Sequence, residues 1–228
     1  MKEKKILFTE MKISLPLYKI LYAVLFVVVL SLIRGVSVSF EIGIAMEPAL
    51  AILAAAFCAD TYALEVVSRR SEVWRLYPLK TRIRAVGRRL LLQQFFLLLV
   101  SAAGYGFFYL FQKPFSFRSI QPGAVSEAAQ FYCFLAAEAV TIVFFSMLSN
   151  TLACLFHNLW FGIGGSLILW LLLDSAYAQR LLGSWNVFSY VFRNVSAADD
   201  WSWLCGKAVC LLFSFAAAAG LPGLLKKR

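Results

Sequence analysis

The chain alternates between long apolar stretches and shorter polar connections. Six stretches, residues 17–33, 42–64, 90–111, 127–149, 159–175 and 203–225, are apolar enough to cross a bilayer. A spanning helix needs about 20 such residues, and even the shortest stretch reaches about 26 Å at a rise of about 1.5 Å per residue. The pattern predicts an all-α polytopic membrane protein with six transmembrane helices in a single domain, residues 1–228.

The connection between the second and third stretches, residues 65–89, concentrates positive charge. It holds eight cations and only two acids, Glu65 and Glu72. An Arg or Lys at the centre of a bilayer costs at least about 2.5 kcal/mol, so this connection must lie in water. Cytoplasmic connections carry the excess of Lys and Arg in membrane proteins. We therefore place it in the cytoplasm, and six crossings place both basic termini there as well.

Part of this connection has a helical apolar stripe. Val66, Val73, Trp74 and Tyr77 recur at helical spacing, and Pro78 should end the helix at about Tyr77. The alternative is an ordinary cationic anchor, but acids and aromatic residues grouped beside the cations favour docking of a soluble partner. The predicted docking residues are Glu65, Arg69, Arg70, Glu72, Trp74, Arg75 and Tyr77.

Two further segments are expected to lie at the membrane surface. Residues 1–16 alternate lysines with apolar residues, which suits either an interfacial helix or a solvated tail. Residues 176–202 form a long connection with a markedly apolar middle, so they should re-enter the outer leaflet or lie along it. By contrast, residues 150–158 are expected to form a short inner turn containing His157.

Composition agrees with a membrane protein. The chain is 61% hydrophobic and 15% charged, with a mean hydropathy of +0.77. Its net charge of +10 follows the predicted cytoplasmic segments, so it indicates topology and contact with anionic lipids rather than nucleic-acid binding. The five cysteines form no C-x-x-C pair and are expected to be buried apolar residues.

The sequence lacks the motifs of common enzyme sites. It has no phosphate-binding loop of the form G-x-x-x-x-G-K-[ST] and no H-E-x-x-H metal motif. We therefore expect no enzymatic activity and no cofactor in this chain.

Charged residues inside the predicted spans are the remaining candidates for function. Glu138 is central in the fourth span, where a carboxylate is either functional or a hydrogen-bonded link between helices. Glu47 lies near the outer end of the second span. Asp60, Asp174 and Lys207 are expected near span ends, where they can reach water or headgroups.

The arrangement resembles the membrane subunits of ABC-2-type ABC exporters. The residues that carry the resemblance are Glu65 and Glu72, then Tyr77-Pro78, then Arg84, Arg88 and Arg89 at the entry to the third span. The resemblance implies an amphipathic N-terminal helix at residues 4–15, a coupling helix within 65–89 and a re-entrant segment within 176–202. The short turn expected at 150–158 leaves little room for a second coupling contact.

The resemblance implies a function for the chain and its partners. A cytoplasmic ABC ATPase, carrying ATP and Mg²⁺, would dock on residues 65–89, and a second permease copy or similar subunit would complete the path. A multi-pass location in a bacterial plasma membrane is expected. Two alternatives remain open: a proton-coupled transporter or channel using Glu138, and a non-transporting membrane scaffold or immunity protein.

Overall fold

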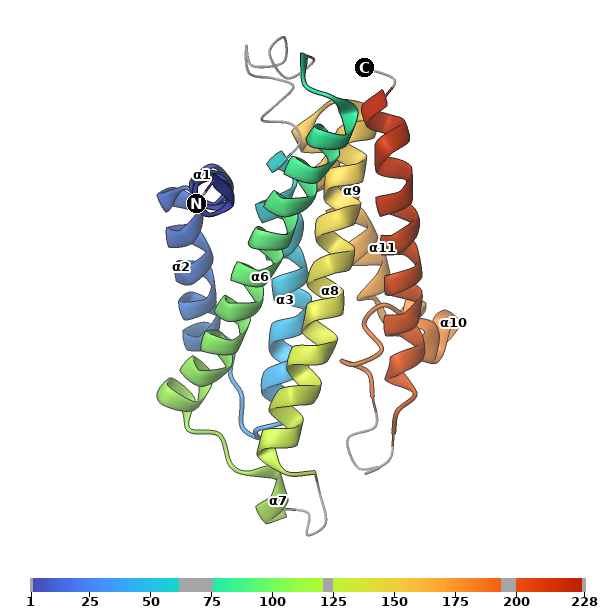
Figure 1. The fold of residues 1–228 in the computed structure, drawn as a ribbon. Helices are drawn as coiled ribbons and strands as arrows, with labels where there is room; N and C mark the ends of the chain where they lie inside the picture. Colours follow the sequence, from blue (N-terminus) through green and yellow to red (C-terminus); the bar gives the residue numbers. More distant parts are fainter. Residues whose placement is uncertain (1, 62–75, 121–124, 194–199, 227–228) are drawn as a thin grey trace.

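The computed structural model describes residues 2–61, 76–120, 125–193 and 200–226 (Figure 1). Within these ranges the chain is helical and contains no strand, apart from an isolated bridge between Val38 and Phe115. One hydrophobic core joins the long helices, as the all-α prediction requires.

The chain begins with a bent pair of helices. Helix α1 covers Lys2–Ser14, and α2 covers Leu17–Ile33, matching the first predicted span. Pro16, in an extended conformation, separates them, and residues 8–14 are inclined by 59° to α2. Helix α1 consequently lies across one end of the bundle, close to the start of α6 (Figure 1).

Helices α3 and α6 flank the undescribed residues 62–75. Helix α3 covers Glu41–Cys58, and α6 covers Leu79–Gln112. The predicted third span, 90–111, lies within α6, whose helix already begins at Leu79. Pro78 is the N-cap of α6, because its fixed φ suits a helix start, and the basic residues that follow it are already helical.

Helix α8, Glu127–Phe156, is the central element of the bundle. It packs against α3, α6, α9 and α11. Helix α9, Leu159–Leu173, follows it directly. The predicted inner turn at 150–158 was wrong: α8 continues to Phe156, and only His157 and Asn158 make the turn. His157 adopts a left-handed conformation, and Asn158 caps α9 by accepting a hydrogen bond from the Trp160 backbone.

The segment after α9 folds back into the bundle. Helix α10, Ala176–Leu182, and the short η1, Gly183–Trp185, lead to a buried run of residues 186–190. Helix α11, Trp203–Lys226, then runs alongside α8. We call residues 186–193 the returning segment. Its buried course agrees with the expectation that this connection would not lie in water.

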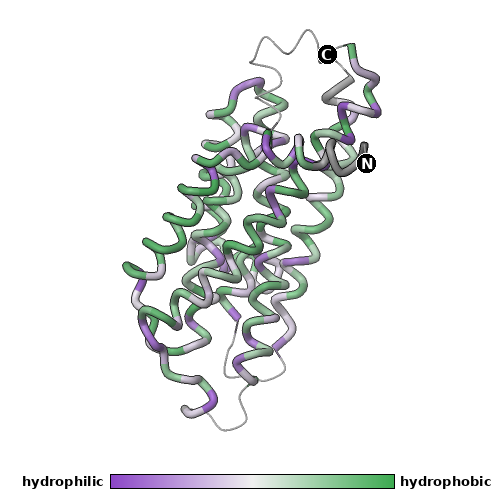
Figure 2. Tube along the Cα trace, turned by 60° about the vertical axis from the view of Figure 1, so that its left-hand side comes forward, coloured by the Kyte–Doolittle hydropathy of each residue, from purple (hydrophilic) through white to green (hydrophobic). Residues whose placement is uncertain are grey.

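Several helices have the length and composition to cross a membrane. Four qualify alone: α3, α6, α8 and α11. Counting the bent pairs α1–α2 and α9–α10 as one span each raises the number to six. Hydrophobic residues dominate the middle parts of the helices (Figure 2). Many of these side chains face outward, including Leu21, Leu25 and Phe95, as expected for contact with lipid.

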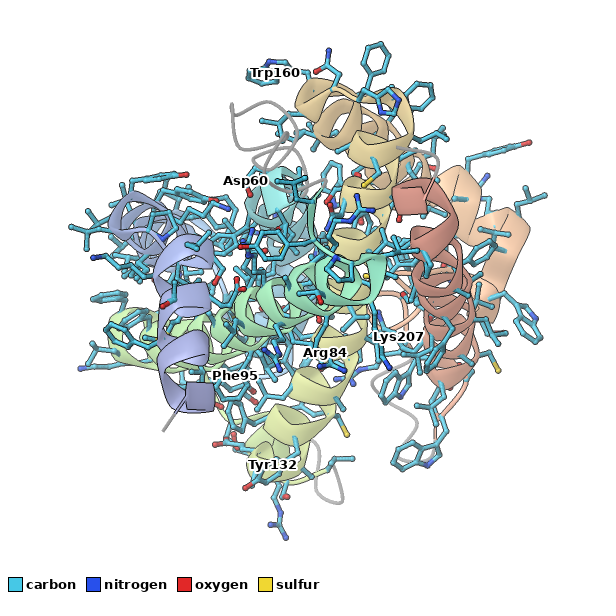
Figure 3. All side chains as sticks on the ribbon, turned by 45° about the horizontal axis from the view of Figure 1, so that its top comes forward. Asp60, Arg84, Phe95, Tyr132, Trp160 and Lys207 are labelled. Atoms are coloured by element: carbon cyan, nitrogen blue, oxygen red, sulfur yellow. The ribbon has the colours of Figure 1, made fainter. Side chains whose placement is uncertain are left out.

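Exposed aromatic residues occur near both ends of the bundle. Trp160, at the start of α9, is 74% exposed, and Tyr132, near the start of α8, is 68% exposed. Both project outward (Figure 3). Trp and Tyr favour the two membrane interfaces, so their positions fit a bundle that crosses a bilayer.

The ends of the helices sort into two groups (Figure 1). Helix α1, the start of α6 and the end of α11 lie at one end, which we call the base. Helix α7, Phe117–Ile120, lies at the other. The predicted docking residues from Glu65 to Arg75 lie outside the described residues. Leu76 is helical and Tyr77 is not, so a helix ends directly before Pro78, as predicted.

We predict that a glycine fixes the distance between α8 and α9. A Cβ added at Gly162 would lie 2.6 Å from the Ser149 carbonyl oxygen and 2.8 Å from the Ala153 Cβ, whereas one at Gly164 meets nothing within 4 Å. Gly162→Ala should therefore be less stable than Gly164→Ala by about 1–3 kcal/mol, because both gain the same helix propensity but only the first is overpacked. Thermal unfolding in detergent measures the difference. Equal stability of the two variants would contradict this packing.

Candidate functional site

A buried lysine occupies the interior of the bundle. Lys207 lies in the second turn of α11 and is 2% exposed. Its side chain points from α11 toward the other helices (Figure 3). The expectation that Lys207 would reach water or headgroups was wrong. The returning segment covers this turn of α11 and separates the Lys207 side chain from the surroundings of the bundle.

The Lys207 ammonium joins four parts of the chain. It donates to Glu47 Oε1 of α3, to Thr141 Oγ1 of α8 at 2.7 Å and to the Val187 carbonyl oxygen at 2.8 Å. An ammonium has three donors, and each is used here. We call Lys207, Glu47, Thr141 and Glu138 the charged centre. A charge buried in this way is tolerated only when it is paired and fully hydrogen-bonded.

Close backbone contact brings the returning segment to Lys207. A Cβ added at Gly206 would lie 1.9 Å from the Asn186 carbonyl oxygen, so only glycine allows α11 to approach this closely. Ser189 Oγ donates to the Trp203 carbonyl oxygen at 2.8 Å. Asn186 Nδ2 donates to the Leu173 carbonyl oxygen at 3.0 Å, which ties the segment to the end of α9. The Val187 carbonyl is thereby held within reach of the lysine.

Glu138 completes the charged centre but has a different environment. It lies one turn before Thr141 on α8 and is 0% exposed. It is near enough to Glu47 and Lys207 to interact with both electrostatically. Neither of its carboxylate oxygens has a hydrogen-bond partner among the described residues, and the same is true of Glu47 Oε2.

Charge balance decides what the centre can do chemically. Lys207 balances the charge of one carboxylate, so the second must be balanced by a proton or another cation if the interior is to stay neutral. Within the described ranges, no group of three or more His, Cys, Asp and Glu side chains is placed to hold a metal ion.

Two further ion pairs lie nearer the base. Lys19 of α2, 3% exposed, donates to Asp60 Oδ1 at 2.5 Å and to the Phe57 carbonyl oxygen at 2.8 Å. Arg89 of α6 donates to Glu10 Oε2 of α1 at 2.5 Å. Asp60 was expected to reach water or headgroups; its side chain is 16% exposed and is bound to a buried lysine. Both pairs join residues at least 41 positions apart in the sequence.

The structure brings together only some of the predicted site residues. Glu47 and Glu138 meet at the charged centre, whereas Asp60 lies at the end of α3 (Figure 3) and Asp174, half-buried, caps α9. Of the predicted docking residues, Tyr77 alone is described, and its side chain is 51% exposed. Lys19 is the site residue that sequence reasoning missed, and the pairing of Lys207 with Glu47 was not predicted. The sequence did contain a sign of these ion pairs. Lys19 and Lys207 are the two cations within the predicted spans, and a cation inside a membrane needs an acidic partner.

A cavity lies beside the charged centre. It has a volume of about 580 Å³ and lies between α8, α9 and α11, next to η1. Its walls are almost wholly apolar and include Phe144, Leu148, Leu169, Trp185 and Phe213. Val187 contributes to both features, because its side chain lines the cavity and its carbonyl accepts from Lys207. Val187 therefore connects the charged centre to one wall of the cavity.

We predict that the Lys207–Glu47 pair stabilises the fold mainly because each residue neutralises the other's buried charge. Lys207→Met should lower the free energy of unfolding by about 3–5 kcal/mol, since it leaves the Glu47 carboxylate unpaired. Adding Glu47→Met should recover most of that loss, because the double variant buries neither charge. Thermal unfolding in detergent gives the comparison. A double variant that is no more stable than Lys207→Met would contradict the pairing.

The two carboxylates should respond differently to the same substitution. Glu138→Gln removes no hydrogen bond made to a described residue, so stability should change by less than about 1 kcal/mol. Glu47→Gln removes the counter-charge of Lys207 and should lower stability by clearly more than Glu138→Gln does. Unfolding of both variants under one set of conditions tests this. The reverse order would mean that Glu138, not Glu47, is the partner of Lys207.

Comparison of the chain with protein-family models, with curated proteins and with solved structures found no match. The resemblance to ABC-2-type permeases therefore rests on the residues and architecture of this chain. The described residues form an all-helical membrane protein with four to six candidate spanning helices and a charged centre buried among them.

Proposed function

We propose that this chain is the membrane subunit of an ATP-driven exporter of the ABC-2 type. In this proposal a separate cytoplasmic ATPase binds ATP and Mg²⁺ and docks on residues 65–89. A second copy of the chain, or a similar subunit, completes the path through the plasma membrane. The chain itself supplies docking surface and helices, and no nucleotide site.

The observation that carries the proposal is the continuity of α6. This helix has 34 residues, about 51 Å at about 1.5 Å per residue, whereas a hydrocarbon core is about 30 Å thick. Its basic first turns therefore extend beyond the apolar interior as part of the same rigid rod. A force applied where residues 65–78 meet α6 would reach the far end of the bundle without passing through a flexible joint.

Contacts at both ends of α6 support this role. At the base, Arg89 binds Glu10, and Gln93 Nε2 donates to the Ser14 carbonyl oxygen at 3.1 Å, so α1 moves with α6. At the other end, Gln112 Nε2 donates to the Ser31 carbonyl oxygen at 2.6 Å, which fixes the end of α2. A displacement of α6 would thus carry α1 and α2 with it.

The apolar cavity suggests the class of cargo. With a volume of about 580 Å³, it falls in the range of roughly 300–1,000 Å³ that is usual for small-molecule sites. Its walls offer hydrocarbon and few polar groups, which suits the apolar part of an amphiphile. The charged centre lies beside it, on the other side of the returning segment.

The docking proposal predicts loss of a specific partner. Glu72→Ala combined with Arg75→Ala should abolish copurification of an ATPase, while the yield and membrane insertion of the chain stay normal. A matched control, Lys113→Ala with Arg118→Ala, removes charge near α7 at the opposite end and should leave association intact. Mass spectrometry of what copurifies in mild detergent gives the result. Normal association in the Glu72/Arg75 variant would refute the coupling assignment.

A second candidate function rests on Glu138. Its unpartnered carboxylate beside a Lys–Glu pair suits proton-coupled transport. Such a transporter would work in vesicles with a pH gradient and without ATPase, and Glu138→Gln would remove the dependence on pH. Transport that requires ATP and is unchanged in Glu138→Gln would exclude it.

A further inference from the structure

A second groove lies near the base, on the other side of α11 from the large cavity. It has a volume of about 310 Å³ and is formed by α6, α8 and α11. Its lining is almost entirely apolar and includes Gly87 and Leu90 of α6, Met147 of α8, and Phe215 and Leu221 of α11. We call it the basal groove.

The basal groove opens to the outside of the bundle. Leu91 is 67% exposed and Phe215 is 70% exposed, and both line it. The space beside Gly87 is open, because a Cβ added there would meet no atom within 4 Å. In a bilayer this face meets lipid, so the groove is accessible to membrane lipids from the side.

Cations stand at the end of the groove that faces the base. Lys80, Arg84, Gly87 and Leu91 are spaced by four, three and four residues, so they share one face of α6. Lys80 and Arg84 are exposed, and neither pairs with an acid among the described residues. Helical side chains lean toward the helix N-terminus, which directs these cations away from the apolar groove and toward the membrane surface. Arg84 lies on the first turns of α6 (Figure 3).

We propose that the basal groove binds one acidic phospholipid from the membrane leaflet at the base. One acyl chain lies in the groove beside Gly87, and the phosphate contacts Lys80 and Arg84. The apolar lining of the groove matches the acyl chain of an anionic lipid, and the cations at its basal end match the phosphate. The proposal concerns this chain alone and does not depend on an ATPase partner.

Photocrosslinking tests whether an acyl chain occupies the groove. The purified chain is placed in nanodiscs of phosphatidylcholine with phosphatidylglycerol that carries a diazirine on one acyl chain. The wild type should crosslink at peptides containing Met147 or Leu221. Gly87→Leu fills the groove and should reduce this crosslinking at least about tenfold. Gly106→Leu is the matched control, because Gly106 also lies on α6 with nothing within 4 Å but does not line the groove, and it should behave like the wild type.

A second pair of variants tests the headgroup contact. Lys80→Gln with Arg84→Gln should lower phosphatidylglycerol crosslinking at least about tenfold, since each basic residue near a membrane surface strengthens binding about fivefold. Lys113→Gln with Arg118→Gln changes the same charge at the opposite end and should have no effect. Since these side chains are exposed, the variants should fold, and their melting temperatures verify it.

Each outcome supports or overturns the site. The site is supported if phosphatidylglycerol crosslinking falls in Gly87→Leu and in Lys80/Arg84→Gln but not in their control variants. Equal crosslinking in Gly87→Leu and Gly106→Leu overturns it. Crosslinking of the wild type by a diazirine phosphatidylcholine as strong as that by the phosphatidylglycerol also overturns it, because it would show only general lipid contact. The assay contains no ATPase, so its failure would leave the docking proposal untouched.

Discussion

Hydrocarbon does not solvate an unpaired charge, and this constraint decides both the interior and the ends of the molecule. Charges that cannot be paired lie at the ends of the helices. Three ion pairs of the described residues lie inside and cross different elements: Glu10 with Arg89, Lys19 with Asp60, and Glu47 with Lys207. Each pair joins residues at least 41 positions apart in the sequence, and breaking it would strand a charge in an apolar environment. Glu138 lies buried beside the last pair, without a hydrogen-bond partner among the described residues.

The pairs also define which parts of the chain are connected. The pairs near the base attach α1 to α6 and α2 to the end of α3. The charged centre attaches α3, α8 and α11 to the returning segment, which forms one side of the apolar cavity. A partner pulling on the base of α6 would therefore act on the whole bundle, while a change of charge at Glu138 would act first on the cavity wall. The two candidate functions differ in which of these inputs drives the protein.

Hydrophobic patterning predicted the helices well and their ends less well. The first span, 17–33, agrees with α2, because Pro16 and Arg34 mark its limits. The turn predicted at 150–158 begins too early, because Asn150 is polar but lies inside α8, where it is only 1% exposed. The helix that contains the predicted third span, 90–111, also includes the basic residues before it, because Arg and Lys are good helix formers and their charge does not end a helix. The partners of Glu47 and Asp60 could not be assigned, since spacing along the chain does not reveal which helices are neighbours.

The most direct test of this account is the side of the membrane on which the base lies. The five native cysteines are replaced by alanine, and single cysteines are placed at exposed Thr81, at the start of α6, or exposed Ser119, in α7. Labelling of intact cells with a membrane-impermeant maleimide should modify Ser119→Cys at once and Thr81→Cys only after permeabilisation. The opposite result would place the cationic base outside the cell, where no cytoplasmic ATPase could reach it, and would contradict both the charge-based topology and the proposed function.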